Sequence, residues 1–140
     1  MHRVTPNDLV YERYPDPVQE ELKTLVADYR GVKWQNVFVG VGSDEAIDML
    51  VRIFCVPGKD NIIINPPTYG MYSVSADTND IGVVKVPLTT EFEMDVEAVL
   101  GAADATTKLC FLCSPGNPAC KLYAYPQSIR AHKFEIHAGA

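Results

Sequence analysis

The sequence lacks any apolar run near the roughly 20 residues that a membrane-spanning helix needs, which argues against an integral membrane protein. Its N-terminal stretch, MHRVTPNDLVYERYPDP, is polar and contains prolines, so no secretory signal peptide is expected. A basic excess is also missing, because 12 Lys and Arg residues stand against 18 Asp and Glu residues, for a net charge of −6. Neither nucleic acid nor an anionic membrane is therefore an expected partner.

Cysteines are few, and without a signal peptide the four present are expected to be reduced thiols of a cytoplasmic protein. Cys110 and Cys113, with His132 and His137 further along, superficially resemble a zinc site. The gap between Cys113 and His132 is too long for a zinc finger, and residues three apart on a strand point to opposite faces. The cysteines are therefore interpreted as apolar strand residues, and no metal site is expected.

Helix-like and strand-like segments alternate along the chain. Apolar residues at helical spacing predict helices over 18–29, 44–55, 69–77 and 95–103. Short apolar runs predict strands over 36–41, 61–65, 83–88 and 108–113. Gly31 is placed to end the first helix, Ser43 to cap the second, and Pro87 to mark a sheet edge or a strand end. This order predicts an α/β fold, a partial three-layer α/β/α sandwich around a mostly parallel sheet.

The segment from Gly40 to Glu45 (GVGSDE) lies between a predicted strand and a predicted helix. Backbone N–H groups at such a junction can bind a phosphate, aided by the positive end of the helix. A dinucleotide fingerprint is excluded because its third small residue would fall at Glu45, and no Gly-Lys-Ser/Thr follows to make a P-loop. An ordinary capped helix explains the segment as well. The carboxylates of Asp44 and Glu45 would repel a phosphate unless at least one turned away.

Two other predicted strands also end in residues that could bind a ligand. Tyr69 follows strand 61–65, and ligands of open α/β sheets bind beyond the carboxyl ends of strands. A tyrosine there could stack on a flat ring, or it could simply be a packing residue. Asn117 follows strand 108–113, where its amide could bond a ligand oxygen, although Gly, Asn and Pro are also ordinary turn residues.

Taken in order, four segments resemble consecutive blocks of the histidinol-phosphate aminotransferases, a branch of the fold-type I pyridoxal-phosphate (PLP) aminotransferases. These segments, which lie between Arg13 and Leu122, are RYPDP, VGVGSDEAIDMLVRIFCVPGKD, PPTYGMYSVSA and LCSPGNP. The resemblance implies that residues 1–122 form the N-terminal part of a PLP-binding large domain. Residues 123–140 are expected to be a divergent, weakly ordered tail.

The resemblance also implies roles for individual residues in holding PLP. Ser43, Asp44 and Glu45 occupy the block whose backbone binds the cofactor phosphate. Tyr69 matches the tyrosine that stacks on the pyridine ring, and Asn117 matches the asparagine that bonds the ring hydroxyl oxygen.

The same resemblance implies an activity and an assembly. Tyr14 matches a tyrosine that reaches into the neighbouring subunit's site in the family homodimer. The implied reaction converts histidinol phosphate and 2-oxoglutarate to imidazole-acetol phosphate and glutamate, in histidine biosynthesis. Its partners would be small amino-acid and phosphate substrates.

The sequence departs from the family where the chemistry is performed. No Ser-Lys pair is present to supply the Schiff-base lysine, and the substrate-binding arginines are missing as well. The family's Asp-Glu-Ala-Tyr block has no counterpart, because Asp44-Glu45-Ala46-Ile47 belongs to the phosphate block. Ala119 and Cys120 replace a usual Thr-Gly. The chain is therefore expected to be truncated before the lysine, to contain no catalytic residue, and to be inactive alone.

Three alternatives stay open at this stage. The chain could be a non-catalytic module that associates with a full-length aminotransferase subunit, or its specificity could be that of another class I or II aminotransferase. It could also be a small redox or metal protein that uses Cys110, Cys113 and the late histidines.

Overall fold

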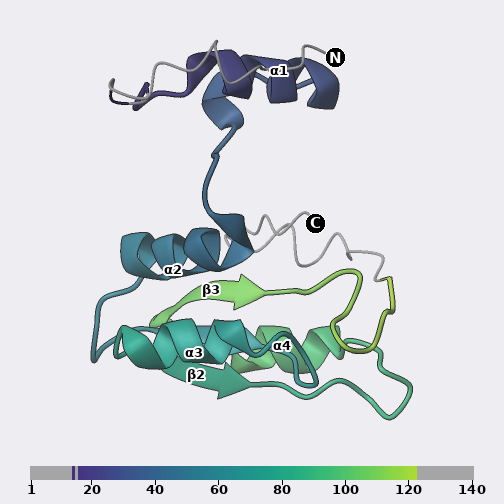
Figure 1. The fold of residues 1–140 in the computed structure, drawn as a ribbon. Coiled ribbons are helices and arrows are strands. Elements are labelled where there is room, and N and C mark those ends of the chain that lie inside the picture. The colour runs from purple at the N-terminus through teal and green to yellow at the C-terminus, as the bar shows by residue number, and fades with distance from the viewer. Residues whose placement is uncertain (1–13, 15, 123–140) are drawn as a thin grey trace. The chain divides into compact units, whose positions relative to one another are not determined.

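The computed structural model describes residue 14 and residues 16–122 (Figure 1). The chain divides into two compact units, Met1–Val41 and Gly42–Ala140, and each is described by itself. The predicted tail at 123–140, with His132 and His137, lies outside the described residues. No helix in the described part is long and apolar enough to cross a membrane.

The first unit contains helix α1 (Glu20–Arg30) and a short 3₁₀ helix, η2 (Trp34–Asn36). Before α1, the Asp16 carboxylate accepts hydrogen bonds from the backbone N–H groups of Val18 and Glu20 at 3.0 and 3.1 Å. The helix ends at Gly31, whose φ of 67° is left-handed and whose N–H donates to the carbonyl of Ala27. The predicted helix and its glycine stop are therefore confirmed.

The strand predicted over 36–41 is wrong. Asn36 closes the 3₁₀ helix, and residues 37–41 belong to no ladder. Val37 has extended backbone angles, but an apolar run becomes a strand only where a neighbouring strand accepts its hydrogen bonds. The described part of this unit contains no strand to do so.

The second unit is built around a sheet of three parallel strands. Helix α2 (Gly42–Phe54) is followed by β1 (Asn61–Ile64), α3 (Met71–Thr78), β2 (Gly82–Lys85), α4 (Val96–Ala102) and β3 (Thr107–Phe111). The strand order is β2-β1-β3, so β1 is central. Strand β2 ends at Lys85, two residues before Pro87, and it lies at an edge of the sheet. Pro87 was expected to mark a strand end or a sheet edge, and both are observed.

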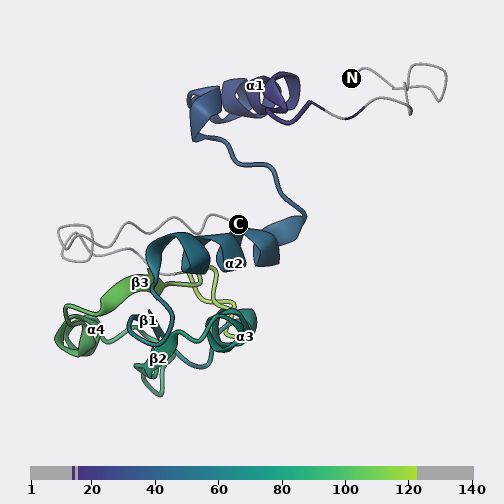
Figure 2. The same ribbon diagram turned by 90° about the vertical axis from the view of Figure 1, so that its left-hand side faces the viewer.

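Helices cover both faces of this sheet, as the end-on view shows (Figure 2). Ile62 and Ile64 of β1 pack with α2 and α3 on one face, whereas Ile63 packs with α4 on the other. All three isoleucines are at most 2% exposed. Burying each contributes about 1.5–3 kcal/mol, and the alternation follows the two-residue period of a strand. The predicted partial α/β/α sandwich is confirmed.

The helix starts differ from expectation in one case. Ser43 lies inside the first turn of α2 instead of capping it, because the helix begins at Gly42, whose φ is 80°. A glycine adopts this left-handed conformation without the steric cost that a side chain would add. By contrast, Asp95 does cap α4, since its carboxylate accepts the Ala98 N–H at 2.9 Å.

Two of the four cysteines point to opposite faces of the sheet, as their spacing predicts. Cys110 belongs to the cluster beside α4, and Cys113 packs against the cluster beside α2 and α3. Among residues 14 and 16–122, no group of three or more His, Cys, Asp or Glu side chains could hold a metal ion. Burial raises the pKa of Cys110 to about 12 and also raises that of Cys55.

This arrangement predicts an order of thiol reactivity with a disulfide reagent at pH 8. The exposed Cys120 should react first and the partly exposed Cys113 next. The thiolate is the reacting form of cysteine, and the reagent must also be able to reach it. Cys55 and Cys110 should react only when denaturant unfolds the chain. Peptide mapping by mass spectrometry gives the rate at each site, and labelling in denaturant is the control. Native Cys110 reacting as fast as Cys120 would contradict the packing.

Candidate functional site

The fold brings together several of the residues that the sequence singled out. Parallel strands end at a common edge of the sheet, so the turns after β1 and β3 leave from the same side. Tyr69 lies in the first of these turns and Asn117 in the second. Ser43, Asp44 and Glu45 form the first turn of α2 in the same unit. Tyr14 is fully exposed and belongs to the other unit.

A hydrogen bond connects two of these candidates. The Tyr69 hydroxyl donates to Oδ1 of Asp44 at 3.0 Å, across a sequence separation of 25 residues. This bond is the main reason that the pKa of Tyr69 lies above its ordinary value, because a carboxylate acceptor favours the protonated phenol. The Asp44 carboxylate is therefore engaged by a side chain, which partly removes the conflict between this acidic turn and an anionic ligand.

The Tyr69 ring is held by further aromatic contacts. It meets Tyr72 edge to face, with ring centroids 5.7 Å apart and planes 83° apart. Tyr72 is 5% exposed and stacks on Phe111 of β3 at 4.7 Å with an interplanar angle of 14°. The Asp44 bond and this stack hold Tyr69 at its hydroxyl and at its ring, so its orientation is fixed by the core.

Asn117 lies in the turn after β3, and its side chain makes no contact that ties it to the other candidate residues. Its side chain is exposed and donates no hydrogen bond to another described residue. The turn itself is closed by Gly116, whose N–H donates to the Lys121 carbonyl at 2.8 Å and whose carbonyl accepts from the Cys120 N–H. Lys121 in turn pairs with the carboxylate of Glu93 and donates to the Glu91 carbonyl at 3.0 Å.

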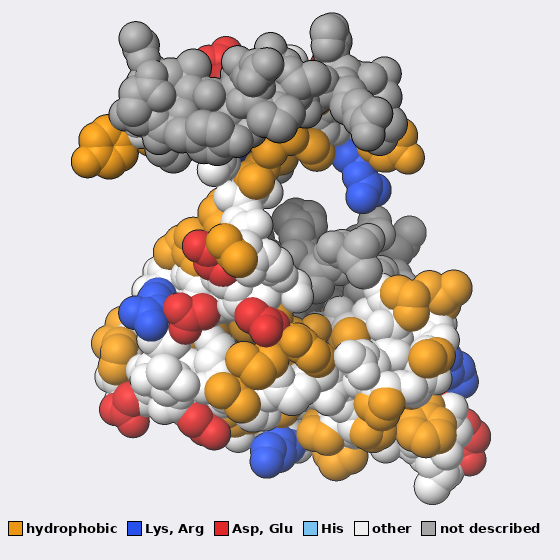
Figure 3. All heavy atoms as spheres, in the orientation of Figure 1, with side chains coloured by type: hydrophobic (Ala, Val, Ile, Leu, Met, Phe, Trp, Pro, Cys, Tyr) orange, Lys and Arg blue, Asp and Glu red, His pale blue; other side chains and the backbone are white. Residues whose placement is uncertain are grey.

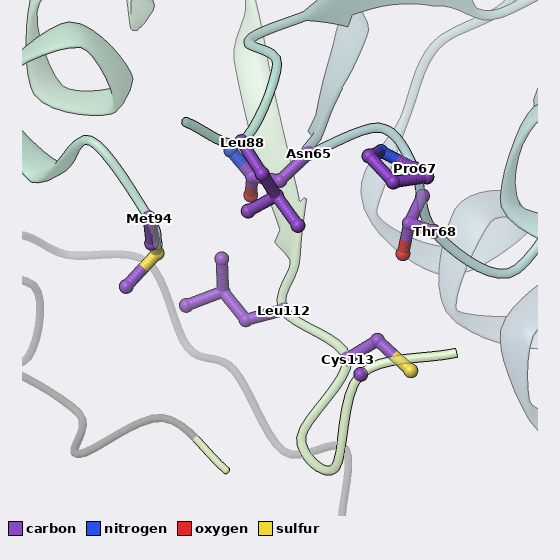
Figure 4. Close-up of a pocket in the computed structure, with 8 residues that line it drawn as sticks. Asn65, Pro67, Thr68, Leu88, Met94, Leu112 and Cys113 are labelled. Carbon is purple, nitrogen blue, oxygen red and sulfur yellow. The ribbon is translucent and has the colours of Figure 1, made fainter. Parts of the chain in front are cut away.

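A small cavity opens at the same edge of the sheet (Figure 4). It measures about 20 Å³. The residues that line it come from the ends of all three strands and the turns that follow: Asn65, Pro67, Thr68, Leu88, Met94, Leu112, Cys113 and Gly116. Asn65 was not singled out from the sequence, although a polar residue at the end of the apolar run NIIIN was the available signal.

Asp48 is another residue that sequence reasoning missed. Its carboxylate accepts hydrogen bonds from Asn79 at 2.7 Å, from Arg52 at 2.7 Å and from Ser75 at 3.2 Å, which joins α2 to α3. The bond from Asn79 is the largest cause of its lowered pKa. Acidic side chains near α2 and α3 lie among apolar ones on the face seen in Figure 3. No sequence signal marks Asp48, because two of its partners, Ser75 and Asn79, lie in α3 and at its C-terminal cap.

Comparisons with known proteins identify the family of the chain. The family model for "Aminotransferase class I and II" matches residues 10–127. The histidinol-phosphate aminotransferases of Cytophaga hutchinsonii and Bacteroides thetaiotaomicron are each 52% identical to the chain. The first match covers 79% of this chain and 32% of that protein, and the second covers 81% and 33%. The chain therefore spans about a third of the length of these relatives.

Solved structures show the same likeness. Tyrosine aminotransferase from Leishmania infantum has a TM-score of 0.69 at 27% identity, over 78% of this chain and 33% of that one. Histidinol-phosphate aminotransferase from Sinorhizobium meliloti in complex with pyridoxal-5'-phosphate has a TM-score of 0.68 at 26% identity. That match covers 76% of this chain and 29% of the other.

The Tyr69–Asp44 bond predicts a change in tyrosine titration. Asp44→Asn removes the negative charge beside the phenol, so the pKa of Tyr69 should fall towards its ordinary value near 10. Because the pKa of Tyr69 is higher in the folded chain than in the unfolded chain, the protonated phenol stabilises the fold below about pH 10. This stabilisation is lost as the pH rises through the folded-state pKa. Carbon NMR of ring-labelled tyrosine measures the titration, with Tyr69→Phe assigning the signal.

Asp48→Asn is the matched control, because it removes a carboxylate of the same helix that does not touch Tyr69. An unchanged Tyr69 pKa in Asp44→Asn would show that the hydrogen bond does not form in solution.

Proposed function

Because this chain belongs to the class I and II aminotransferases, which are PLP-dependent transferases, we propose that residues 42–122 form the phosphate and ring-stacking side of a PLP site. The observation that carries the proposal is the hydrogen bond from Tyr69 to Asp44. It places the candidate ring-stacking residue beside the helix start that would bind the phosphate. The boundary of the large-domain segment at Leu122 remains a prediction.

The first turn of α2 has the chemistry that a phosphate requires. The backbone N–H groups of Ser43 and Asp44 are among those that an α-helix leaves without intrahelical partners, and the helix dipole adds positive potential there. Gly42 begins the turn, and a Cβ added to it would meet no atom within 4 Å, so the backbone is open on that side. With Asp44 directed to Tyr69, the N–H groups of Ser43, Asp44 and Glu45 are proposed to hold the phosphate.

Tyr69 and Asn117 are proposed to hold the ring. Tyr69 would offer a face of its ring for stacking, while the contact with Tyr72 and the bond to Asp44 hold the side chain in place. The exposed amide of Asn117 would donate to the ring hydroxyl oxygen. PLP supplies an electron sink for reactions at an amino-acid α-carbon, and these residues contribute binding and orientation.

The reaction proposed for a protein that contains this segment is amino transfer between histidinol phosphate and 2-oxoglutarate. Relatives about half identical in sequence are named histidinol-phosphate aminotransferases, which supports this substrate class. The sequence contains no Ser-Lys pair, so the imine-forming lysine would have to come from outside these 140 residues. Tyr14 is proposed to reach the site of a second subunit. The 140-residue polypeptide alone is proposed to be inactive.

The proposal predicts weak, non-covalent PLP binding by the 140-residue chain. PLP absorbance and near-UV circular dichroism should titrate with protein, and inorganic phosphate should compete, since the phosphate group carries most of the contact. Tyr69→Ala should weaken binding by roughly tenfold or more, and Tyr69→Phe should weaken it less, because it keeps the stacking ring but releases the Asp44 carboxylate beside the phosphate. Tyr29→Ala, an exposed tyrosine of α1, is the control for general surface effects.

Borohydride reduction followed by mass spectrometry completes the test. The expected result is no adduct concentrated on one lysine, together with no transamination of histidinol phosphate. Equal PLP affinity in Tyr69→Ala and the unaltered chain would refute the assigned site, and turnover by the isolated chain would refute the proposed inactivity.

A further inference from the structure

We propose that Lys121 is a positioning residue, which holds the turn 116–121 against the loop 89–93 and thereby sets the position of Asn117. The attachment of the turn rests on the contacts of Lys121 alone. Its consequence for the cofactor rests on the proposed function, in which Asn117 donates to the ring hydroxyl oxygen of PLP.

Lys121 is bonded to the loop 89–93 at two points. Its Nζ pairs with the carboxylate of Glu93 and donates to the Glu91 carbonyl at 3.0 Å. Its own carbonyl accepts the Gly116 N–H at 2.8 Å, so the backbone of the same residue closes the turn. Lys121 therefore joins the turn to the loop, with its backbone on one side and its ammonium group on the other.

The loop 89–93 is itself fixed to the sheet. The Leu88 N–H donates to the Pro66 carbonyl at 2.8 Å, which extends the pairing of β1 with β2 up to the start of the loop. Within the loop, the Thr89 N–H donates to the Glu93 carbonyl at 2.9 Å, and the Glu93 N–H donates to the Thr89 hydroxyl at 3.1 Å. A residue that is anchored on this loop is thus connected to the turn after β1.

Cys120, the residue before Lys121, has a backbone conformation that costs free energy. Its φ of 54° lies in the left-handed region, which glycine adopts freely and other residues rarely do. Its N–H donates to the Gly116 carbonyl across the turn. Such a conformation persists only where the surrounding bonds enforce it, and those of Lys121 are on the next residue.

The expected effect of Lys121 is local. Its side chain is 35% exposed and that of Glu93 is 57% exposed, and an exposed ion pair contributes little to the stability of a fold. Asn117 is exposed as well, so the backbone of the turn determines where its amide points. Loss of the Lys121 bonds should therefore loosen the turn and the position of Asn117, while the sheet stays folded.

The first experiment measures the turn without PLP. In Lys121→Met, amide hydrogen exchange at Gly116 and Cys120 should become roughly threefold faster or more, because both N–H groups are bonded within the turn. Exchange at Val86, whose N–H donates to Ile64, should stay the same, which separates local loosening from unfolding. Lys121→Arg should restore slow exchange, since a guanidinium also donates to carboxylate and carbonyl oxygens. Unchanged exchange at both turn amides in Lys121→Met would overturn the proposal.

The second experiment tests whether Lys121 acts through Asn117. A donor to the ring hydroxyl oxygen favours its ionised form, so Asn117→Ala should raise the pKa of that hydroxyl in bound PLP, measured from its absorbance. Lys121→Met should raise this pKa as well and weaken PLP binding roughly threefold. In the double variant, Lys121→Met should add nothing to the effect of Asn117→Ala. Additive effects, or an unaltered titration in Lys121→Met, would refute the positioning role.

Lys85→Met is the matched control. It makes the same substitution at the exposed carboxyl end of β2, on the edge of the sheet where the candidate site lies. PLP affinity and the titration of bound PLP should stay close to those of the unaltered chain. An equal loss of affinity in Lys85→Met would show that Lys121 acts only as a positive charge near an anionic ligand.

The two proposals fail in different ways. If the unaltered chain binds no PLP, the proposed function is wrong, and hydrogen exchange still decides whether Lys121 holds the turn. If Asn117→Ala leaves the titration of bound PLP unchanged, the ring contact assigned to Asn117 is wrong, and the positioning role falls with it. If Tyr69→Ala weakens binding but Lys121→Met changes neither exchange nor titration, the PLP site stands and the role of Lys121 falls.

Discussion

The structure depends on the parallel pairing of β1 with a strand on each side. Because β1 is central, its three isoleucines are buried alternately against α2 and α3 and against α4. Parallel pairing also places the carboxyl ends of β1 and β3 at the same edge, where polar turn residues gather without interrupting the apolar layers. The same constraint thus produces the core and assembles the candidate site, so destabilising β1 would affect both.

The charge at the start of α2 is the feature that most needs explanation in a turn that is proposed to bind a phosphate. Two acidic residues favour the helix dipole and stabilise the helix when no ligand is bound, but they oppose an anion. The bond from Tyr69 engages Asp44, and Tyr69 is in turn held by Tyr72 and Phe111. Aromatic packing in the core therefore determines where a carboxylate in the first turn of α2 points. In the proposed site, one hydrogen bond would couple the orientation of the Tyr69 ring to the binding of the phosphate.

The sequence predicted those parts of the molecule that local patterns determine. Apolar periodicity located the helices and three of the strands, and the strand ends identified Tyr69 and Asn117. The run 37–41 has the composition of a strand, yet pairing depends on a neighbour that no local pattern reveals. Asp48 and Asn65 were not predicted for the same reason. Asp48 is bonded by Asn79, 31 residues away, and Asn65 donates to Val86, 21 residues away. Tyr14 and its dimer role remain predictions.

A cofactor site on a parallel sheet is assembled from several strand ends. Groups that bind the cofactor and groups that react with it can therefore lie in different parts of the sequence. The turns after β1 and β3, with the start of α2, contain the groups that are proposed to stack on the ring, donate to it and attract its phosphate. The lysine that the family resemblance calls for follows a serine, and the 140-residue sequence contains no Ser-Lys pair. If the proposed site is correct, binding of the cofactor and catalysis with it are separable along the sequence, and the described residues carry the binding groups.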